Sequence, residues 1–472
     1  MINRRELQGL AFDEICRTIF NDNATREQNY IRLKKIISSL FPTKESEFEY
    51  DKAITAFKIA YENNSSEVIK GFLEHPGFVK AFGEVFTPDF LIKDMLSKLP
   101  KNVWRNPNLK WLDNSCGSGN FLVYVKNKLM VTLSDVIPDK LEREQHILEN
   151  MLYGVDLQAK NLLITIDRLD KNEITLDRLD KNGNYKLNLS HNSALKFDYW
   201  DEKFDIIIGN PPYQDNSGNK GTGHTLWDKF VTLAINTLLK PNGYLCYVHP
   251  SVWRQPNHPM LDVIKSKQLI YLEMHDISDG QKVFKASTRY DWYVLKNSPC
   301  VERTKIKGQD GEIVLENLNR WDFIPNAMFK EIKSIIAKDN EEKIDIVHSY
   351  SAYETRKKWV SKVEKDGFIY PIVYSTKKGD IPILWWSSKN DNGHFGVPKV
   401  ILSNGVGIVV DEDGEYGLTE WARGIAEKPE NLDALKDYLE SDKFDRLRSS
   451  FQIDSSNFNI KVACKFKKDF WK

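Results

Sequence analysis

The ten residues from Phe204 to Tyr213 constrain the fold of this chain more than any other stretch, because an apolar run leads directly into Asn-Pro-Pro-Tyr. Proline has no N–H to donate, so a strand that reaches two prolines cannot continue its ladder. The backbone is then held at the carboxyl edge of a sheet, where open α/β folds bind ligands. The side-chain carbonyl of Asn210 and the backbone carbonyl of Pro211 can point at one amino group, beside the flat ring of Tyr213. The tetrad thus predicts a site for the exocyclic amino group of a base; a proline-rich loop after a buried strand is the alternative.

The composition is that of a globular protein. The 472 residues leave room for two or three domains, and no stretch reaches the roughly 18 to 20 apolar residues that span a membrane. No apolar core of a signal peptide follows residues 1–6. The five cysteines lack CxxC spacing and the nine histidines lack HxxxH spacing. We therefore expect a reduced, cytoplasmic protein without a membrane segment or a bound metal.

Apolar spacing divides the chain into three regions. Residues 1–82 repeat apolar side chains every three or four positions, as helices do. Residues 83–300 alternate strands with helices, which predicts an α/β domain with a largely parallel sheet. The seven candidate strands are 110–112, 152–155, 186–189, 204–208, 243–248, 269–275 and 290–295, and the last two can pair antiparallel at the sheet edge. Residues 301–472 carry more turn signals, which indicates a separate mixed α/β or α+β domain.

A tandem repeat of ten residues lies in the middle of the α/β region. Residues 164–172 read ITIDRLDKN, and after one glutamate residues 174–182 read ITLDRLDKN. Two short copies are too few for a solenoid. We expect a tolerated duplication in a surface helix or loop, without a functional role.

A glycine loop precedes the tetrad. Residues 111–121 read WLDNSCGSGNF, which predicts a short strand, a turn at Gly117 and Gly119, and the start of a helix. Glycines there let the backbone pass close to a ligand, although a plain tight turn is the alternative and the full GxGxxG of dinucleotide sites is missing. Asp113, directly before the loop, suits a positively charged cofactor better than a pyrophosphate.

Three more polar positions accompany this loop. Asp156 ends the second strand and is placed to hold a ribose diol, with helix capping as the alternative. Asn192 follows the third strand, where it can bind an adenine edge or make a simple turn. Thr87 and Pro88 fit the cap and first position of a helix, and a cofactor contact of this segment is an equal alternative.

In this order the segments resemble the motifs of γ-class DNA N6-adenine methyltransferases, the methylase subunits and domains of restriction–modification systems. The segments are FGEVFTP (82–88), LDNSCGSGNF (112–121), YGVD (153–156), IIIGNPPY (206–213), GHTLWDKFV (223–231) and LKPNGY (239–244), followed by Pro250-Ser251. The resemblance covers about residues 80–300, and the motifs are specific jointly rather than singly. The chain departs from the family at Asn114 or Ser115, where proline is frequent.

The resemblance implies a Rossmann-like sheet of seven strands, with one antiparallel edge strand, that binds S-adenosyl-L-methionine. It assigns Asp113, Gly117 and Gly119 to the methionine end of the cofactor. It assigns Asp156 to the ribose and Asn192 to the cofactor adenine, with Phe86, Thr87 and Asn210 lining the same pocket.

The resemblance also implies catalysis by Asn210, Pro211, Pro212 and Tyr213 on an adenine flipped out of duplex DNA. Two carbonyl acceptors would bond both amino hydrogens and favour a tetrahedral nitrogen, and Tyr213 would stack on the base. Phe284 can close the other face of the base; an ordinary core aromatic is the alternative. Adenine is favoured because N4-cytosine enzymes of the family more often carry Ser-Pro-Pro. No cysteine nucleophile is needed, so Cys116 and Cys246 are expected to be small buried residues.

The region from 301 to 472 is long enough to recognise a DNA target. Lysine plus arginine and aspartate plus glutamate each number 67, so contacts with double-stranded DNA must come from local basic clusters. The candidate clusters, each of which can instead be a solvated face, comprise Arg356, Lys357, Lys358, Lys377, Lys378, Lys465, Lys467 and Lys468. No nuclease motif is evident in the first 80 residues, so a cognate restriction endonuclease would be a separate partner.

Two other functions remain open on the sequence. A methyltransferase acting on a protein glutamine or on RNA could also use Asn-Pro-Pro-Tyr, although the segment before the glycine loop and the large C-terminal region argue against it. A non-catalytic DNA-binding protein on the same fold is the second alternative, and the complete motif set argues against that.

Overall fold

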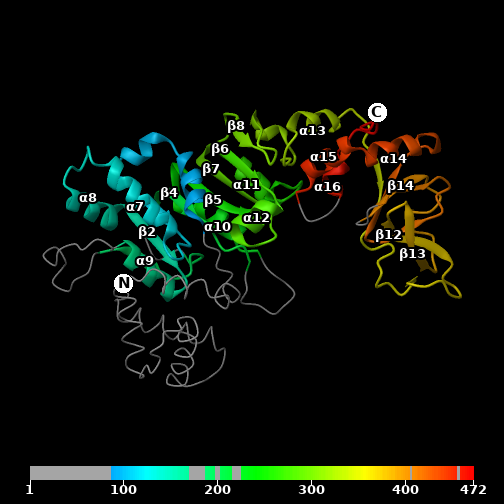
Figure 1. The fold of residues 1–472 in the computed structure, drawn as a ribbon, viewed down its shortest axis with the longest axis horizontal. Coiled ribbons are helices and arrows are strands. Elements are labelled where there is room, and N and C mark those ends of the chain that lie inside the picture. Colours follow the sequence, from blue (N-terminus) through cyan, green and yellow to red (C-terminus); the bar gives the residue numbers. More distant parts are fainter. Residues whose placement is uncertain (1–86, 170–185, 197–201, 215–224, 404–406, 454–457) are drawn as a thin grey trace, which may run out of the picture. The chain divides into compact units, whose positions relative to one another are not determined.

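The computed structural model describes residues 87–169, 186–196, 202–214, 225–403, 407–453 and 458–472 (Figure 1). The helices expected within residues 1–82 lie outside this part of the chain. The chain forms two compact units. The first runs up to Pro250 and includes Ser266–Leu272 and Ile277–Val301; the second comprises Ser251–Lys265, Glu273–Asp276 and Glu302–Lys472.

A nine-stranded mixed sheet has the strand order β3-β2-β1-β4-β5-β7-β6-β8-β9. Its strands are β1 (Trp111–Asp113), β2 (Leu152–Asp156), β3 (Asn188–His191), β4 (Phe204–Gly209), β5 (Leu239–Pro250), β6 (Lys267–His275), β7 (Tyr290–Pro299), β8 (Thr304–Lys307) and β9 (Ile313–Glu316). All seven expected strands are present, with the third shifted by two residues, and the methyltransferase-like α/β fold is confirmed. The hairpin of β8 and β9 was not expected as part of the sheet.

The antiparallel strand does not lie at the edge of the sheet. Strands β1 to β5 pair in parallel, and β7 runs antiparallel to β5. Because β7 stands between β5 and β6, the expectation of an antiparallel edge strand was wrong. The physical reason is visible in its burial, since the residues from Tyr290 to Leu295 are all buried on both faces, as an interior strand requires.

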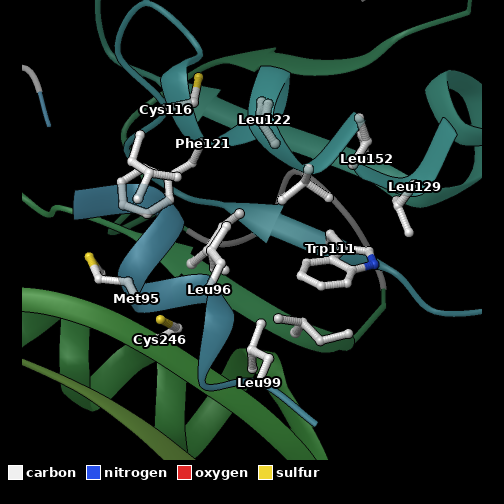
Figure 2. Packing of buried hydrophobic residues seen from close by; sticks show 14 of the residues in the cluster. Met95, Leu96, Leu99, Trp111, Cys116, Phe121, Leu122, Leu129, Leu152 and Cys246 are labelled. Atoms are coloured by element: carbon white, nitrogen blue, oxygen red, sulfur yellow. The ribbon is translucent and has the colours of Figure 1, made fainter. Parts of the chain in front are cut away.

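Helices cover both faces of these strands. In the first unit they are α6 (Asp89–Ser97), α7 (Asn120–Thr132), α8 (Lys140–His146), α9 (Ala159–Leu169), α10 (Trp227–Leu233) and α12 (Ile277–Phe284). Short helical turns lie at Lys101–Arg105, Ile147–Met151 and Ala234–Leu238. Figure 2 shows Met95 and Leu96 of α6 and Leu122 of α7 in the same buried cluster as Trp111 of β1. Trp227 of α10 packs on the other face of the sheet. Its ring stacks on that of His249 of β5, with the ring centroids 4.5 Å apart.

The second unit contains two further four-stranded sheets. One has the order β10-β17-β14-β15 and the other β11-β13-β12-β16. Their strands are β10 (Asp345–Val347), β11 (Val360–Ser361), β12 (Tyr370–Lys377), β13 (Ile381–Ser387), β14 (Lys399–Ser403), β15 (Val409–Asp411), β16 (Gly417–Leu418) and β17 (Ala422–Ala426). Its helices are α11 (Pro259–Lys265), α13 (Phe329–Ile335), α14 (Leu432–Glu440), α15 (Asp442–Phe451) and α16 (Ile460–Ala463).

A small apolar core and a buried ion pair hold these sheets. Val373 of β12 packs with Ile401, Val409 and Leu418. Lys399 Nζ lies 2.5 Å from Asp411 Oδ2, and both side chains are almost completely buried. Among the described residues, no helix is long and apolar enough to cross a membrane.

Candidate active site

The carboxyl ends of four parallel strands place the expected polar residues along one edge of the sheet. The strands are neighbours in the order β3-β2-β1-β4. Asp113 ends β1 and Asp156 ends β2, while Asn192 follows β3 and Asn210 follows β4. Carboxylates and amides from separate segments therefore gather at the edge where parallel sheets bind ligands.

The loop after β1 turns through two left-handed glycines. Gly117 has φ +51° and Gly119 has φ +80°, a region that side chains with a Cβ avoid. Asn120 begins α7 directly after Gly119, so the unpaired N–H groups of the first helical turn lie at the end of this loop. The amide of Cys116 donates to the carbonyl of Val155 on β2 at 3.0 Å. The expected glycine loop that opens a helix is thus confirmed.

Asp156 ties the end of β2 to this loop. Its Oδ2 accepts from the amide of Gly117 at 2.9 Å. Its Oδ1 accepts from the amide of Gln158 at 2.8 Å and from the side-chain amide of Asn161 at 3.1 Å. Because α9 begins at Ala159, Asp156 is too far upstream to be its cap, so the alternative of a helix cap is wrong.

Asn192 lies beside Asp156 and makes a local turn. Its amide donates to the carbonyl of Asp156 at 3.1 Å. Its Oδ1 accepts from the amide of Ser193 at 3.1 Å, which is the turn role that the sequence left open. A contact of this half-buried side chain with a cofactor adenine stays a prediction.

Asp113 is the most deeply buried acid of the edge, with 1% of its surface exposed. Burial, together with the charge of Asp156, raises the pKa of its carboxyl group to about 8, although a hydrogen bond from the Ser115 amide opposes this shift. Gly209 at the end of β4 makes room for it, since a Cβ there would lie 2.9 Å from Asp113 Oδ1. The glycine before the tetrad therefore brings two strand ends together.

The segment before α6 differs from the expectation by one residue. Pro88, not Thr87, is the cap of α6, because the amides of Leu91 and Ile92 both donate to the carbonyl of Pro88. Thr87 is buried, and its carbonyl accepts from the side-chain amide of Asn120 at 3.1 Å. This contact brings the segment to the glycine loop, while Phe86 lies outside the described residues.

Two buried polar atoms of the tetrad have no partner among the described residues. The Oδ1 of Asn210 and the hydroxyl of Tyr213 are both buried, and neither has a hydrogen-bond partner within the described part of the chain. Pro211 is buried and Pro212 is exposed. The Tyr213 carbonyl accepts from the amide of Leu226 at 3.1 Å, which anchors the backbone after the tetrad.

The surroundings of Tyr213 keep its phenol neutral. Burial raises the pKa of Tyr213 far above its ordinary value, with further contributions from Tyr290 and Asp291 of β7. Phe284 ends α12, is buried in the main core and meets the ring of Tyr290 edge-on at 4.8 Å. These contacts match the alternative of a core aromatic, and stacking of Phe284 on a base stays a prediction.

A second buried amide lies next to Asp113. The Oδ1 of Asn114 accepts from the hydroxyl of Tyr247 on β5 at 2.5 Å. Its Nδ2 and the Oγ of Ser115 are buried without a partner among the described residues. Cys116 and Cys246 are buried as expected, and burial raises the pKa of both thiols.

The first copy of the tandem repeat packs on the glycine loop, which the sequence did not indicate. Ile164, Thr165 and Leu169 of α9 are buried, so the expectation of a surface element is wrong for this copy. The reason is that Thr165 and Arg168 both donate hydrogen bonds to the loop. The second copy, residues 174–182, lies entirely outside the described residues.

Of the eight basic candidates of the second unit, five have an acidic neighbour and the other three are exposed. Lys465, Lys467 and Lys468 lie within 4 Å of Asp322, Glu341 and Glu342. Arg356 and Lys357 share Glu354. Lys358, Lys377 and Lys378 are exposed.

Comparison with known proteins identifies the part of the chain that carries the tetrad. The model of the Eco57I restriction-modification methylase family matches residues 126–284. This stretch is an Eco57I restriction-modification methylase domain. The methylase domain begins within α7 and ends with α12, so it includes β2, the tetrad and β6, while β1 and Asp113 precede it.

Two curated relatives and one solved structure resemble the chain. An uncharacterized adenine-specific methylase of Mycoplasma pneumoniae is 24% identical over 52% of this chain and 70% of its own length. The modification methylase CviBIII of Paramecium bursaria Chlorella virus NC1A is 24% identical over 46% of this chain and 50% of its own. The type IIL restriction-modification enzyme MmeI in complex with DNA is 12% identical, with a TM-score of 0.45 over 85% of this chain and 69% of that one.

Proposed function

We propose that this chain is a site-specific DNA adenine methyltransferase that moves a methyl group from S-adenosyl-L-methionine to N6 of a flipped-out adenine. The observation that carries the proposal is the tetrad, where the buried Oδ1 of Asn210 and the buried hydroxyl of Tyr213 have no partner among the described residues. A buried acceptor without a partner costs about 1–3 kcal/mol. Such an arrangement is expected where a substrate completes the hydrogen bonds.

The polar edge fits a cationic cofactor. Asp113 and Asp156 place two carboxyl groups on neighbouring strand ends, and the left-handed Gly117 and Gly119 bring backbone close to them. Asn114 adds a buried donor that has no partner among the described residues. S-adenosyl-L-methionine, held by Asp113, the glycine loop, Asp156 and Asn192, with Phe86 and Thr87 adjoining, would supply an electrophilic methyl group.

The residues of the tetrad would prepare the amino nitrogen. Asn210 Oδ1 and the carbonyl of Pro211 would accept the two N6 hydrogens, which draws the nitrogen lone pair out of conjugation with the ring. The consecutive prolines hold these acceptors in place at the end of β4, so the hydrogen bonds need little reorganisation. Tyr213 would stack on the flipped base, with Phe284 as a second aromatic wall.

Duplex DNA is the proposed substrate, and residues 301–472 are the proposed target-recognition region. A base inside a duplex cannot reach a pocket at a sheet edge, so it must be flipped out. The basic candidates of the second unit would contact phosphates rather than read sequence. A restriction endonuclease with the same target would be the partner in a restriction–modification system.

The test is the identity of the methylated product. Purified protein and S-adenosyl-L-methionine are incubated separately with duplex DNA, RNA and a protein mixture, and the products are hydrolysed and identified by mass spectrometry. We expect N6-methyladenine in DNA. N4-methylcytosine alone would contradict the choice of base, and transfer only to RNA or protein would contradict the choice of substrate. If the wild-type protein binds DNA but methylates nothing, the non-catalytic alternative holds.

The Asn210→Ala variant tests the site. Loss of one preorganised hydrogen-bonding group at a reaction centre lowers kcat by roughly a hundredfold or more, so we expect a loss of that size while the melting temperature stays close to wild type. Asn102→Ala, at an exposed asparagine of the same unit, is the matched control and should keep full turnover. Equal turnover of Asn210→Ala and the control would place the chemistry elsewhere.

A further inference from the structure

Arg168 of α9 donates hydrogen bonds to the glycine loop. We propose that Arg168, assisted by Thr165, is a positioning residue that sets the conformation of the cofactor loop from Gly117 to Asn120. This inference rests on the proposed function, because the loop is taken to bind the methionine end of the cofactor.

The guanidinium of Arg168 contacts three acceptors of the loop with one nitrogen. Its Nη1 donates to the carbonyl of Ser118 at 2.7 Å and to Oδ1 of Asn120. A weaker contact reaches the Ser118 hydroxyl at 3.4 Å. Hydrogen bonds from a charged donor are about twice as strong as neutral ones. The cation therefore fixes both the second half of the loop and the first residue of α7.

Thr165, one helical turn earlier on the same face of α9, fixes the first half of the loop. Its hydroxyl donates to the carbonyl of Gly117 at 3.0 Å, and the residue is fully buried. A Cβ on Gly119 would lie 2.8 Å from Thr165 Cγ2. The helix thus donates hydrogen bonds to Gly117, Ser118 and Asn120, and Thr165 leaves no room for a Cβ on Gly119.

These contacts also decide where the loop amides point. In a trans peptide the C=O and the following N–H point in opposite directions. Because the Gly117 carbonyl faces Thr165, the amide of Ser118 is turned away from α9. Two left-handed glycines separated by a single residue have high conformational freedom without such contacts, so the bonds to α9 lower the entropy that ligand binding must remove.

Asn120 extends the network to the segment before α6. Its Nδ2 donates to the carbonyl of Thr87 at 3.1 Å while its Oδ1 accepts from Arg168. One arginine therefore connects α9, the start of α7 and the segment before α6, all of which the proposed cofactor site uses. Burial lowers the pKa of Arg168, and the charge of Asp89 opposes that shift.

The experiment measures cofactor binding without turnover. Titration calorimetry with S-adenosyl-L-methionine and with S-adenosylhomocysteine is performed on the wild type, Arg168→Met and Arg168→Lys. We expect Arg168→Met to raise the Kd for both ligands at least tenfold, with kcat at saturating cofactor within about twofold of wild type. Arg168→Lys should recover part of the affinity, because it keeps one charged donor. In the protein without cofactor, amide hydrogen exchange at residues 116–120 should speed up in Arg168→Met.

Two controls separate positioning from general stability. Arg178→Met makes the same change at the matching position of the second repeat copy and should leave the Kd unchanged. Lys126→Met/Glu144→Gln removes the buried ion pair that also anchors α9 through a bond from Lys126 to the Leu169 carbonyl. That variant should lower the melting temperature while affecting the Kd much less than Arg168→Met.

The outcomes distinguish the two proposals. If the wild type binds neither ligand, the proposed cofactor and function fail. If it binds both and Arg168→Met binds them equally well, the positioning role of Arg168 is wrong while the proposed function stands. Weakening of binding by Arg178→Met or by the ion-pair variant to the same extent as by Arg168→Met would also overturn the positioning role.

Discussion

Asp113 is the residue whose chemistry differs most from that of the same side chain in water. Its carboxyl group is buried at the end of β1 beside Gly209 of β4, and burial raises its pKa to about 8. At neutral pH, without a ligand, its carboxyl group is therefore largely protonated. A cationic ligand would favour the ionised form, so the proposed cofactor and a proton compete for this group.

The raised pKa predicts how stability depends on pH. The folded state binds the proton of Asp113 more tightly than the unfolded chain, whose pKa is near 3.8. The contribution of this group is fully present below about pH 4 and is lost as the pH rises through about 8. In Asp113→Asn this loss is absent, so the stability of the wild type relative to the variant should fall by up to roughly 1.4 kcal/mol per pH unit. Urea unfolding at pH 5, 6, 7 and 8 measures this, and parallel stability curves would show that Asp113 does not titrate in this range.

The sequence predicted which residues form the site better than it predicted their hydrogen bonds. Asp113, Asp156, Asn192 and Asn210 could be located because each follows an apolar run that reads as a strand. The bond between Asn114 and Tyr247 joins residues 133 positions apart, and no local pattern indicates it. The role of Arg168 could not be predicted for the same reason, since its acceptors lie about 50 positions earlier in the sequence.

At the scale of elements, the glycine loop is shaped by the helix that packs on it. Gly117 and Gly119 are both left-handed, but their surroundings differ. A Cβ on Gly117 meets nothing within 4 Å, whereas a Cβ on Gly119 collides with Thr165. A side chain at Gly117 would therefore cost backbone strain alone, whereas a side chain at Gly119 would cost both backbone strain and a clash.

The Gly117→Ala and Gly119→Ala variants test this difference. Gly117→Ala should lower the free energy of unfolding by about 1–2 kcal/mol, the cost of a left-handed non-glycine residue. Gly119→Ala should cost clearly more, because the neighbouring helix must also move. Adding Thr165→Ala should recover more stability in the Gly119→Ala background than in the Gly117→Ala background. Chemical denaturation measures all four variants, and equal costs at the two glycines would mean that α9 does not press on the loop.

The elements themselves were largely predictable, and their order in the sheet was not. All seven expected strands exist because apolar runs bounded by turn residues are a local signal. The placement of β7 between β5 and β6 depends on pairing across the chain, which periodicity does not encode. The start of α6 was predicted one residue too early. The Thr87-Pro88 pair fits a threonine cap followed by a proline in the first helical position, but it fits equally well an extended threonine followed by a proline cap.

At the scale of the whole molecule, equal numbers of acidic and basic residues make local charge decisive. The lysines near the C-terminus looked like a basic cluster in sequence, yet Lys465 pairs with Asp322 from 143 positions earlier. In the folded chain these lysines thus face carboxylates that are distant in sequence, although the local sequence shows only positive charge. The exposed Lys358, Lys377 and Lys378 are the better candidates for phosphate contacts.

Two triple variants test this ranking. Lys358→Gln/Lys377→Gln/Lys378→Gln should weaken duplex binding and reduce the slope of log K against log salt by up to about 0.9 per lost phosphate contact. Lys465→Gln/Lys467→Gln/Lys468→Gln should change the slope much less, because those lysines already face carboxylates. Fluorescence anisotropy at several salt concentrations measures both slopes. A larger effect of the second variant would reverse the ranking.

The packing of α9 means that the tandem repeat carries the residues of the loop contact twice. The two copies differ at one position of nine and repeat with a period of ten residues, so removal of ten residues leaves one intact copy. Whichever copy is lost, the remaining sequence still carries threonine and arginine at the spacing of Thr165 and Arg168. The chain can therefore be shortened by one repeat unit without losing the residue types that hold the loop.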